Sequence, residues 1–244
     1  MRTRSFGNTL PSKWQCVPWL PWNKQKLATS EVVAQLNVPN QILFSNIVTW
    51  NINGFHSKYN YIAKMLYDQK IGIACLQEML FNSARQPLVI KGYETYGIDR
   101  EVGFRGQAIL IDTLLPSYQI PHVEKHLLHV QVLCWSTPIG TIQLDIFLVY
   151  LPSGGNHRRD RKKILSTLCQ IIIETRSTRP DSKFVILGDF NEPYDSLDHI
   201  LGKWNNGVFH QMTKGSSLTR FPKFGNPSNL DHVLVNHMVK PYFK

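Results

Sequence analysis

The sequence predicts an α/β sandwich, in which β-sheets and helices pack in layers. Apolar segments of strand length recur along the chain, among them "ILFSNIVTWNI", "IGIACLQE", "TIQLDIFLVYL" and "KFVILGDF". Segments with helical spacing lie between some of these strands, as in "KYNYIAKMLYDQK" and "RRDRKKILSTLCQIIIETR". Because strands and helices do not alternate strictly, the order favours a layered sandwich over a doubly wound parallel sheet.

The composition divides the chain into a basic, Trp/Pro-rich N-terminal extension, residues 1–44, and a regular domain, residues 45–244. Five Lys or Arg residues precede the first acid, Glu31, and three tryptophans lie among prolines. Such an extension either grips nucleic acid by phosphate contact and base stacking or packs its tryptophans on the domain. Within it, "SEVVAQL" has a weak helical pattern, with Ser30 as the N-cap.

The charge balance indicates a polyanionic partner. Lys and Arg number 27 against 17 Asp and Glu, which gives a formal net charge of +10 and fits nucleic acid or an anionic membrane surface. We expect no membrane insertion, because no apolar run approaches the roughly 20 residues that span a bilayer. Prolines and polar residues interrupt the N-terminus, and the four cysteines are scattered. We therefore expect an intracellular protein with free thiols, not a secreted one.

Four strand candidates end in polar side chains, and this set is the main functional signal. The residues concerned are Asn51 and Asn53, Glu78, Tyr150 and Ser153, and Asp189 and Asn191. Strand ends at one rim of a sandwich bring distant side chains into a common cleft, and these oxygen-rich groups suit a hard cation such as Mg²⁺.

Each member of the set also has a purely structural explanation. Asn51 is a typical turn residue, Tyr150 can cap a strand, and an Asp-x-Asn pair can form an Asx turn. Glu78 is more informative alone, because a carboxylate directly after an apolar strand is costly to desolvate unless it is paired or bound to metal. The specificity therefore lies in the combination.

Five motifs resemble, in content and order, those of the endonuclease/exonuclease/phosphatase superfamily. They are "WNING", "LQE", "VYLPSGG", "LGDFN" and "LTRFPKFGNPSNLDHVLV", and the resemblance covers residues 46–236. The chain is most similar to the apurinic-type endonuclease domain of LINE-type (non-LTR) retrotransposons, on account of "NING" and of His232 in "LDHVLV". The resemblance implies a four-layered α/β sandwich of two packed mixed β-sheets flanked by helices.

The resemblance also implies roles for individual residues. Glu78 would bind the catalytic metal, Mg²⁺ or alternatively Mn²⁺, and Asn51 would help to place metal and phosphate. Tyr150 would contact the scissile phosphate. Asp189 would activate the attacking water, and Asn191 would donate a hydrogen bond to that water or to the developing charge. The phosphate and substrate site would be completed by Thr219, Asn53 and Ser153.

Asp231 raises a question about activity. In the family, this aspartate accepts a hydrogen bond from a catalytic histidine in a Ser-Asp-His tripeptide farther along the chain, and no such tripeptide follows "LDHVLVNHMVKPYFK". His232 would point to the opposite face of a strand, and His237 lies beyond its end. We therefore expect a fragment of a longer reading frame or a decayed copy with reduced nicking. Its last strand would be missing, which leaves an unpaired sheet edge.

The function expected from these observations is a Mg²⁺-dependent phosphodiester hydrolase, a DNA-nicking endonuclease of retrotransposon type. It would act in the nucleus, with a reverse transcriptase region as its partner in a longer retroelement protein. The alternatives are a superfamily member acting on abasic DNA, RNA or phosphoinositide, and an inactive remnant that binds nucleic acid. The basic segment 157–163 either contacts DNA or forms a solvated face, and Arg105 either reaches a phosphate or belongs to a glycine-rich hairpin.

Overall fold

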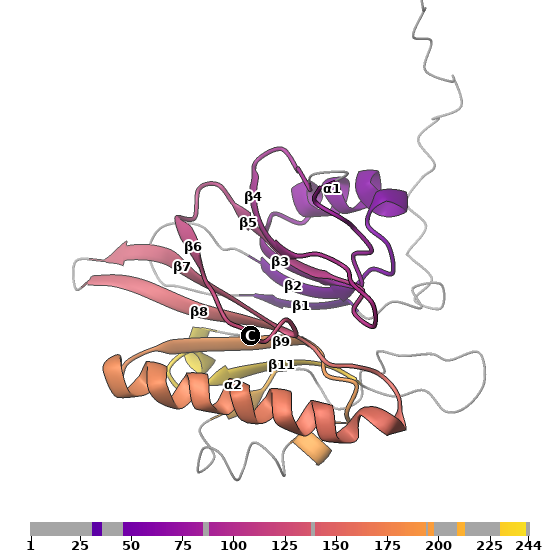
Figure 1. The fold of residues 1–244 in the computed structure, drawn as a ribbon. Helices are drawn as coiled ribbons and strands as arrows, with labels where there is room; N and C mark the ends of the chain where they lie inside the picture. The colour runs from indigo at the N-terminus through magenta and orange to yellow at the C-terminus, as the bar shows by residue number, and fades with distance from the viewer. Residues whose placement is uncertain are drawn as a thin grey trace, which may run out of the picture.

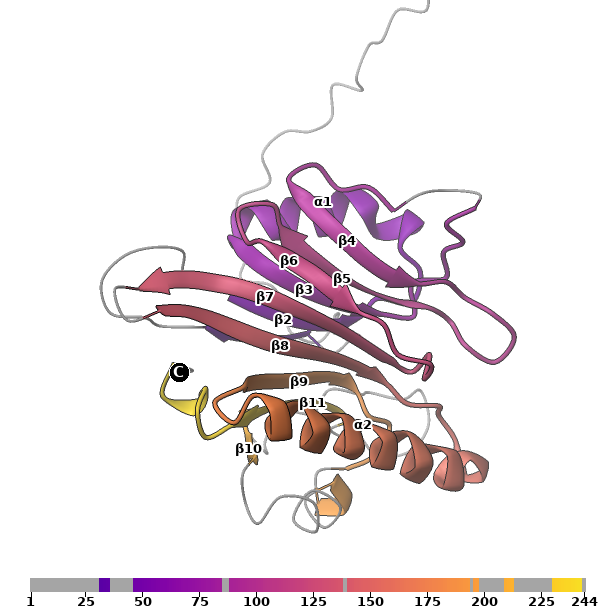
Figure 2. The same ribbon diagram turned by 60° about the vertical axis from the view of Figure 1, so that its left-hand side comes forward.

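The structure is a computed structural model that describes residues 31–35, 46–84, 88–137, 140–193, 195–197, 209–212 and 230–242. Two mixed β-sheets pack face to face, and one α-helix covers the outer face of each (Figures 1 and 2). The layers therefore run helix, sheet, sheet, helix. The predicted α/β sandwich is therefore confirmed. No helix within the described residues is long and apolar enough to cross a bilayer.

The first sheet has five strands in the order β1-β2-β3-β5-β4. Its strands are β1 (Glu31–Gln35), β2 (Asn46–Asn51), β3 (Ile71–Gln77), β4 (Tyr93–Ile98) and β5 (Gln107–Asp112). Strands β2 and β3 are parallel, and their crossover contains the short helix η2 (His56–Lys58) and helix α1 (Tyr59–Asp68). The other pairs in this sheet are antiparallel.

The second sheet has six strands in the order β10-β11-β9-β8-β7-β6. Its strands are β6 (Ser117–Ile120), β7 (Leu127–Thr137), β8 (Gly140–Tyr150), β9 (Lys183–Asp189), β10 (Phe209–Gln211) and β11 (Asp231–Asn236). Strands β8 and β9 are parallel, with η3 (Gly155–His157) and helix α2 (Arg158–Thr178) in the crossover. A final short helix, η4 (Lys240–Tyr242), follows β11.

Strand β11 is not an edge strand, because three of its residues pair with β10 on one side while β9 pairs with it on the other. That the sandwich lacks its last strand stays a prediction.

The segment expected to be helical near the N-terminus is a strand instead. Residues 31–35 form β1, which pairs antiparallel with β2 along its whole length. The adjacent β-branched pair Val32 and Val33 favours extended backbone, and pairing with an existing strand outweighs the weak helical spacing of "SEVVAQL". The three tryptophans of the N-terminal extension lie outside the described residues.

Apolar side chains fill three layers, and the alternation of each strand decides which layer a side chain enters. In β9, Val185 and Leu187 pack between the two sheets, whereas Phe184 and Ile186 pack under α2. All seven residues of β3 are buried, since both faces of this central strand are covered. The continuous apolar runs in the sequence therefore correspond to strands buried on both sides.

Gly188, next to the end of β9, occupies a position that only glycine fits. Its φ is +138°, and a Cβ atom there would lie 2.0 Å from the carbonyl oxygen of Val149 on the parallel strand β8. The close approach of these two strands brings their ends, Tyr150 and Asp189, into register. The glycine of the "LGDFN" motif is thus a requirement of the strand pairing.

We predict that Gly188→Ala lowers the free energy of unfolding by about 3 kcal/mol, because the strands must separate to admit the methyl group. Urea denaturation followed by circular dichroism measures this change. Gly155→Ala is the control, since its Cβ would meet open space, and it should stay within about 0.5 kcal/mol of the unsubstituted protein. Equal effects of the two substitutions would contradict the steric account.

Candidate active site

The ends of four strands from both sheets meet at one rim. Asn51 ends β2, Glu78 follows β3, and Tyr150 and Asp189 end β8 and β9. The Nδ2 atom of Asn51 lies 3.1 Å from Oε1 of Glu78 and 3.0 Å from Oδ2 of Asp189. One amide nitrogen therefore bridges two carboxylates that belong to different sheets.

The backbone at this rim is unusual. Among the described residues, five other than glycine have positive φ, and four of them lie here: Asn53, Glu78, Leu80 and Asn191. Each such conformation costs about 1–3 kcal/mol and persists only where neighbouring groups hold it. Around Glu78, its own carbonyl accepts from Gly54 N at 2.8 Å, and Leu80 N donates to the carbonyl of Arg105 at 2.8 Å.

Both carboxylate oxygens of Asp189 are engaged. In addition to the Asn51 contact, Oδ1 accepts a hydrogen bond from the backbone N–H of Asn191 at 3.0 Å. The side-chain amide of Asn191 donates to the carbonyl of Leu151 at 2.8 Å and so ties the segment after β9 to the segment after β8. The Asp-x-Asn pair is thus an Asx turn and also part of this rim, so the two interpretations of the motif are compatible.

Tyr150 lies largely buried beside the two carboxylates, with its ring centroid 5.6 Å from that of Phe104. Burial raises the pKa of its hydroxyl, and the negative charges of Glu78 and Asp189 raise it further. The Tyr150 hydroxyl therefore keeps its proton at neutral pH and acts as a hydrogen-bond donor, here to Glu78.

Two cations complete the rim. Sequence reasoning missed Lys58, and for Arg105 it left open a phosphate contact or a place in a glycine-rich hairpin. Arg105, in the turn between β4 and β5, forms an ion pair with Glu78, and its Nη2 donates to Oδ1 of Asn53 at 2.8 Å. Lys58 donates a hydrogen bond to the carbonyl of Ile52. Burial lowers the pKa of the Lys58 ammonium group, and the negative charge of Glu78 partly offsets this lowering. The glycines around Arg105 indicated the turn but not this contact, and Lys58 had no distinguishing signal.

Asp231 lies directly opposite Asp189 on the antiparallel pair β11 and β9, so that the two side chains share a face. His232 faces the other way, as strand alternation predicts: its Nε2 is 2.9 Å from the carbonyl oxygen of Glu192, and its ring packs on Phe190. His237 is exposed in the turn after β11.

The remaining predicted residues contribute less to the geometry. Ser153 is exposed in the loop between β8 and η3, and Thr219 lies outside the described residues. In the part of the chain that the structure describes, no three His, Cys, Asp or Glu side chains are grouped as a metal site. The rim instead offers two carboxylates and amide groups, whose oxygen atoms could act as metal ligands.

The chain belongs to the endonuclease/exonuclease/phosphatase family, whose model matches residues 48–242. Comparison with curated protein sequences gives no match.

Three similar solved structures support the same fold. The endonuclease domain of TRAS1, a telomere-specific non-LTR retrotransposon, is 16% identical with a TM-score of 0.57, over 78% of this chain and 84% of that one. The 3′ phosphatase NExo from Neisseria, bound to product DNA hairpin, is 16% identical with a TM-score of 0.57, over 78% and 86%. TDP2 from Caenorhabditis elegans is 16% identical with a TM-score of 0.52, over 78% of this chain and 63% of that one. The chain thus spans less than two thirds of that TDP2 structure.

We predict that Asn51→Asp destabilises the fold more than Asn51→Ala does at pH 7.5. The aspartate removes the bridging donor and places a further negative charge beside Glu78 and Asp189. The free energy of unfolding should fall by about 2 kcal/mol, or Tm by about 5 °C. Thermal unfolding of both variants, repeated at pH 4, measures the effect. Because acid neutralises carboxylates, the difference should shrink at pH 4; a difference that is absent at pH 7.5 or independent of pH would contradict the bridge.

Proposed function

We propose that the protein is a Mg²⁺-dependent phosphodiesterase that nicks DNA, of the retrotransposon endonuclease type. The observation that carries the proposal is the Asn51 amide that bridges the Glu78 and Asp189 carboxylates. Hydrolysis of a phosphodiester requires neutralisation of the charge on the phosphoryl oxygens and a base for the attacking water. With two carboxylates hydrogen-bonded to one amide, one carboxylate can hold a cation that neutralises the phosphate and the other can serve as the base.

The residues at the rim fit a magnesium ion. Mg²⁺ is usually bound by one or two carboxylates and otherwise keeps water or substrate phosphate as ligands, so the small oxygen donor set is sufficient. Glu78 is the proposed ligand, with Asn51 placing its carboxylate, and Mn²⁺ takes similar ligands. The ion pair with Arg105 supports this assignment, because it shows that a positive group fits against Glu78. When bound, the ion would neutralise charge on the phosphate.

The protein's own groups supply the remaining steps. Asp189 orients the attacking water and accepts its proton, and the two hydrogen bonds that Asp189 receives fix the direction of its carboxylate. Asn191 has a second side-chain N–H to donate to that water. The protonated hydroxyl of Tyr150 donates to a phosphate oxygen, and Asn53 and Ser153 contact the substrate where the rim opens to solvent.

DNA is the proposed substrate for two reasons. The formal net charge of +10 favours a polyanion, and both TRAS1 and the DNA-bound NExo share the fold. A nuclear location and a reverse transcriptase region as partner belong to the same proposal. Abasic DNA, RNA and phosphoinositide are the competing substrates, and a parallel assay with all four distinguishes them.

A second candidate function is nucleic-acid binding without cleavage. The orientation of His232 favours it, because this ring contacts the Glu192 carbonyl on the face opposite Asp231 and so cannot protonate a leaving oxygen near Asp189. In that case the chain would bind DNA and leave it intact.

We predict that Asp189→Asn reduces the rate of supercoiled-plasmid nicking in Mg²⁺ by about 10³-fold, because the proton acceptor is lost. The fraction of relaxed plasmid over time, measured on agarose gels, gives the rate. Asp181→Asn is the matched control, since Asp181 is exposed beyond the end of α2, and it should nick normally. Nicking that survives Asp189→Asn would refute the assignment, whereas DNA binding without nicking by the unsubstituted chain would favour the second candidate.

We also predict that Glu78→Gln weakens metal binding at least about tenfold, since losing even a residue that only orients a metal ligand typically has that effect. Titration of Mn²⁺ followed by electron paramagnetic resonance reports free ion directly and needs no turnover. Glu101→Gln is the control, because Glu101 is exposed and pairs with Lys125. If Glu78→Gln binds Mn²⁺ as tightly as this control, the metal is held elsewhere.

A further inference from the structure

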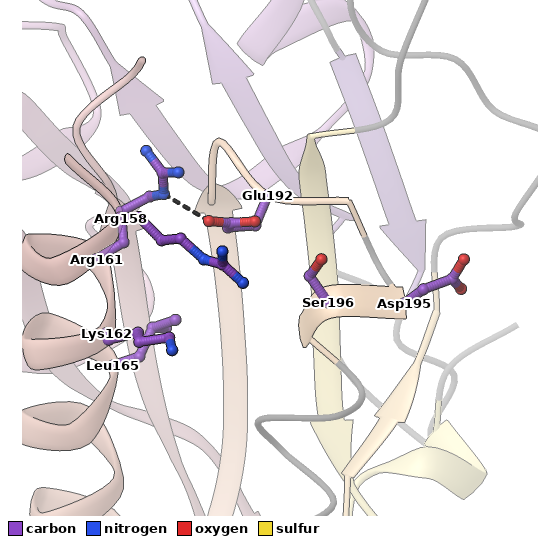
Figure 3. A pocket seen from close by; sticks show the side chains of 7 residues that line it. All are labelled: Arg158, Arg161, Lys162, Leu165, Glu192, Asp195 and Ser196. Carbon is purple, nitrogen blue, oxygen red and sulfur yellow. Dashed lines mark hydrogen bonds and ion pairs between the residues drawn. The ribbon is translucent and has the colours of Figure 1, made fainter. Parts of the chain in front are cut away.

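A pocket of about 400 Å³ lies between the first turns of α2 and the segment that follows β9 (Figure 3). Arg158 and Lys162 line it from the helix, and Glu192 and Ser196 line it from the opposite side. Neither the proposed metal site nor the proposed base includes these residues. The pocket is therefore a separate feature whose chemistry is set mainly by its cations.

The two walls of the pocket belong to the two segments that follow the strand ends of the rim. The helix wall begins with Arg158, in the segment that leaves β8 at Tyr150, and the opposite wall begins with Glu192, in the segment that leaves β9 at Asp189. A substrate strand whose scissile phosphate lies at the rim thus has the pocket beside it.

Arg161 holds the two walls together and neutralises the nearest acid. Its Nε lies 2.7 Å from Oε1 of Glu192, and its Nη1 donates to the carbonyls of Pro152 and Gly154 at 3.0 and 2.7 Å. The Arg161 side chain is only 9% exposed, so this link is largely shielded from solvent. The charge of Glu192 is therefore already balanced within the protein.

Arg158 and Lys162 are left as the cations available to a ligand. They lie four residues apart on one face of α2, and both are exposed. Within the described residues, neither forms an ion pair with a carboxylate. In Figure 3 both side chains extend from the helix into the pocket, while the carboxylate of Asp195 points away from α2. The first-turn N–H groups of α2 add to the attraction for an anion.

We propose that this pocket binds a backbone phosphate of the nucleic-acid strand, adjacent to the phosphate that is cleaved. The proposal rests on the proposed function, which it narrows: the substrate must continue beyond the scissile bond, so a polynucleotide fits and a small phosphate ester does not fill the site. Arg158 and Lys162 hold that phosphate by charge, and Ser196 offers a hydroxyl donor from the opposite wall.

The test compares two double substitutions on the same helix. Arg158→Ala/Lys162→Ala empties the pocket of its available cations, and Arg159→Ala/Lys163→Ala removes the same charge from exposed neighbours that do not line the pocket. Fluorescence anisotropy with a labelled DNA duplex in EDTA measures Kd at several salt concentrations. We expect the Arg158/Lys162 substitution, the pocket pair, to weaken binding about tenfold and to reduce the slope of log K against log salt by about 1. The Arg159/Lys163 substitution, the control pair, should change Kd less than about twofold.

The outcomes separate the pocket from general charge and from catalysis. Equal losses for the two pairs, or no loss for the pocket pair, would overturn the proposal, as would pocket-dependent binding to phosphoinositide vesicles without binding to duplex. EDTA prevents metal-dependent cleavage, so the binding measurement does not depend on nicking. If the pocket pair weakens binding in EDTA but the unsubstituted chain never nicks plasmid in Mg²⁺, the nicking function is refuted and the phosphate-binding pocket is not. Should the alanine pair fail to fold, Arg158→Gln/Lys162→Gln removes the charges with less loss of packing and is judged by the same criteria.

Discussion

The hydrogen bonds that Asn51 donates to Glu78 and Asp189 are the interaction on which the rest of the rim depends. Two carboxylates that approach each other repel, and burial increases that repulsion unless a donor lies between them. The amide supplies the donor, and because the carboxylates come from different sheets it also fixes how the sheet ends meet. The left-handed backbone at Glu78 and the glycine at 188 serve the same geometry. The first lies directly after β3, where the Glu78 side chain joins the rim, and the second admits the close approach of β8 and β9 that brings Tyr150 and Asp189 into register.

Positively charged side chains surround this pair of carboxylates, some in contact with it and others farther away. Arg105 and Lys58 lie closest and balance Glu78, so the rim is not strongly anionic as it stands. Farther out, Arg158 and Lys162 line the pocket beside the strand ends. A polyanionic strand can therefore approach a site that contains carboxylates, because the cations that attract it flank the acids that would act on it.

The layers of the sandwich, and the positions of polar residues at the strand ends, could be predicted from the sequence. Apolar runs such as that of β3 identify strands buried on both faces, and alternation correctly predicts that His232 turns away from Asp231. The segment with helical spacing, "RRDRKKILSTLCQIIIETR", forms α2. These features follow from local patterns of apolar and polar residues, and such patterns are contained in the amino-acid sequence itself.

Contacts that join distant segments could not be predicted in this way. The ion pair of Arg105 with Glu78 depends on where a turn in one hairpin meets the end of a different strand, and no local pattern encodes that distance. The error at residues 31–35 has a related cause, because a weak helical spacing gave way to pairing with β2, a partner that the spacing itself does not reveal. The link from Arg161 to Glu192 likewise required the crossover of α2 to be placed on its sheet.

Locating the metal ion decides whether Glu78 holds it beside Asp189, the proposed base. Anomalous diffraction from crystals grown with Mn²⁺ would do so without depending on turnover or on the substrate. We expect an anomalous peak within coordination distance of a Glu78 carboxylate oxygen, with the Arg105 guanidinium displaced from that oxygen. A peak bound elsewhere, or an intact ion pair of Arg105 with Glu78 and no peak at saturating Mn²⁺, would contradict it.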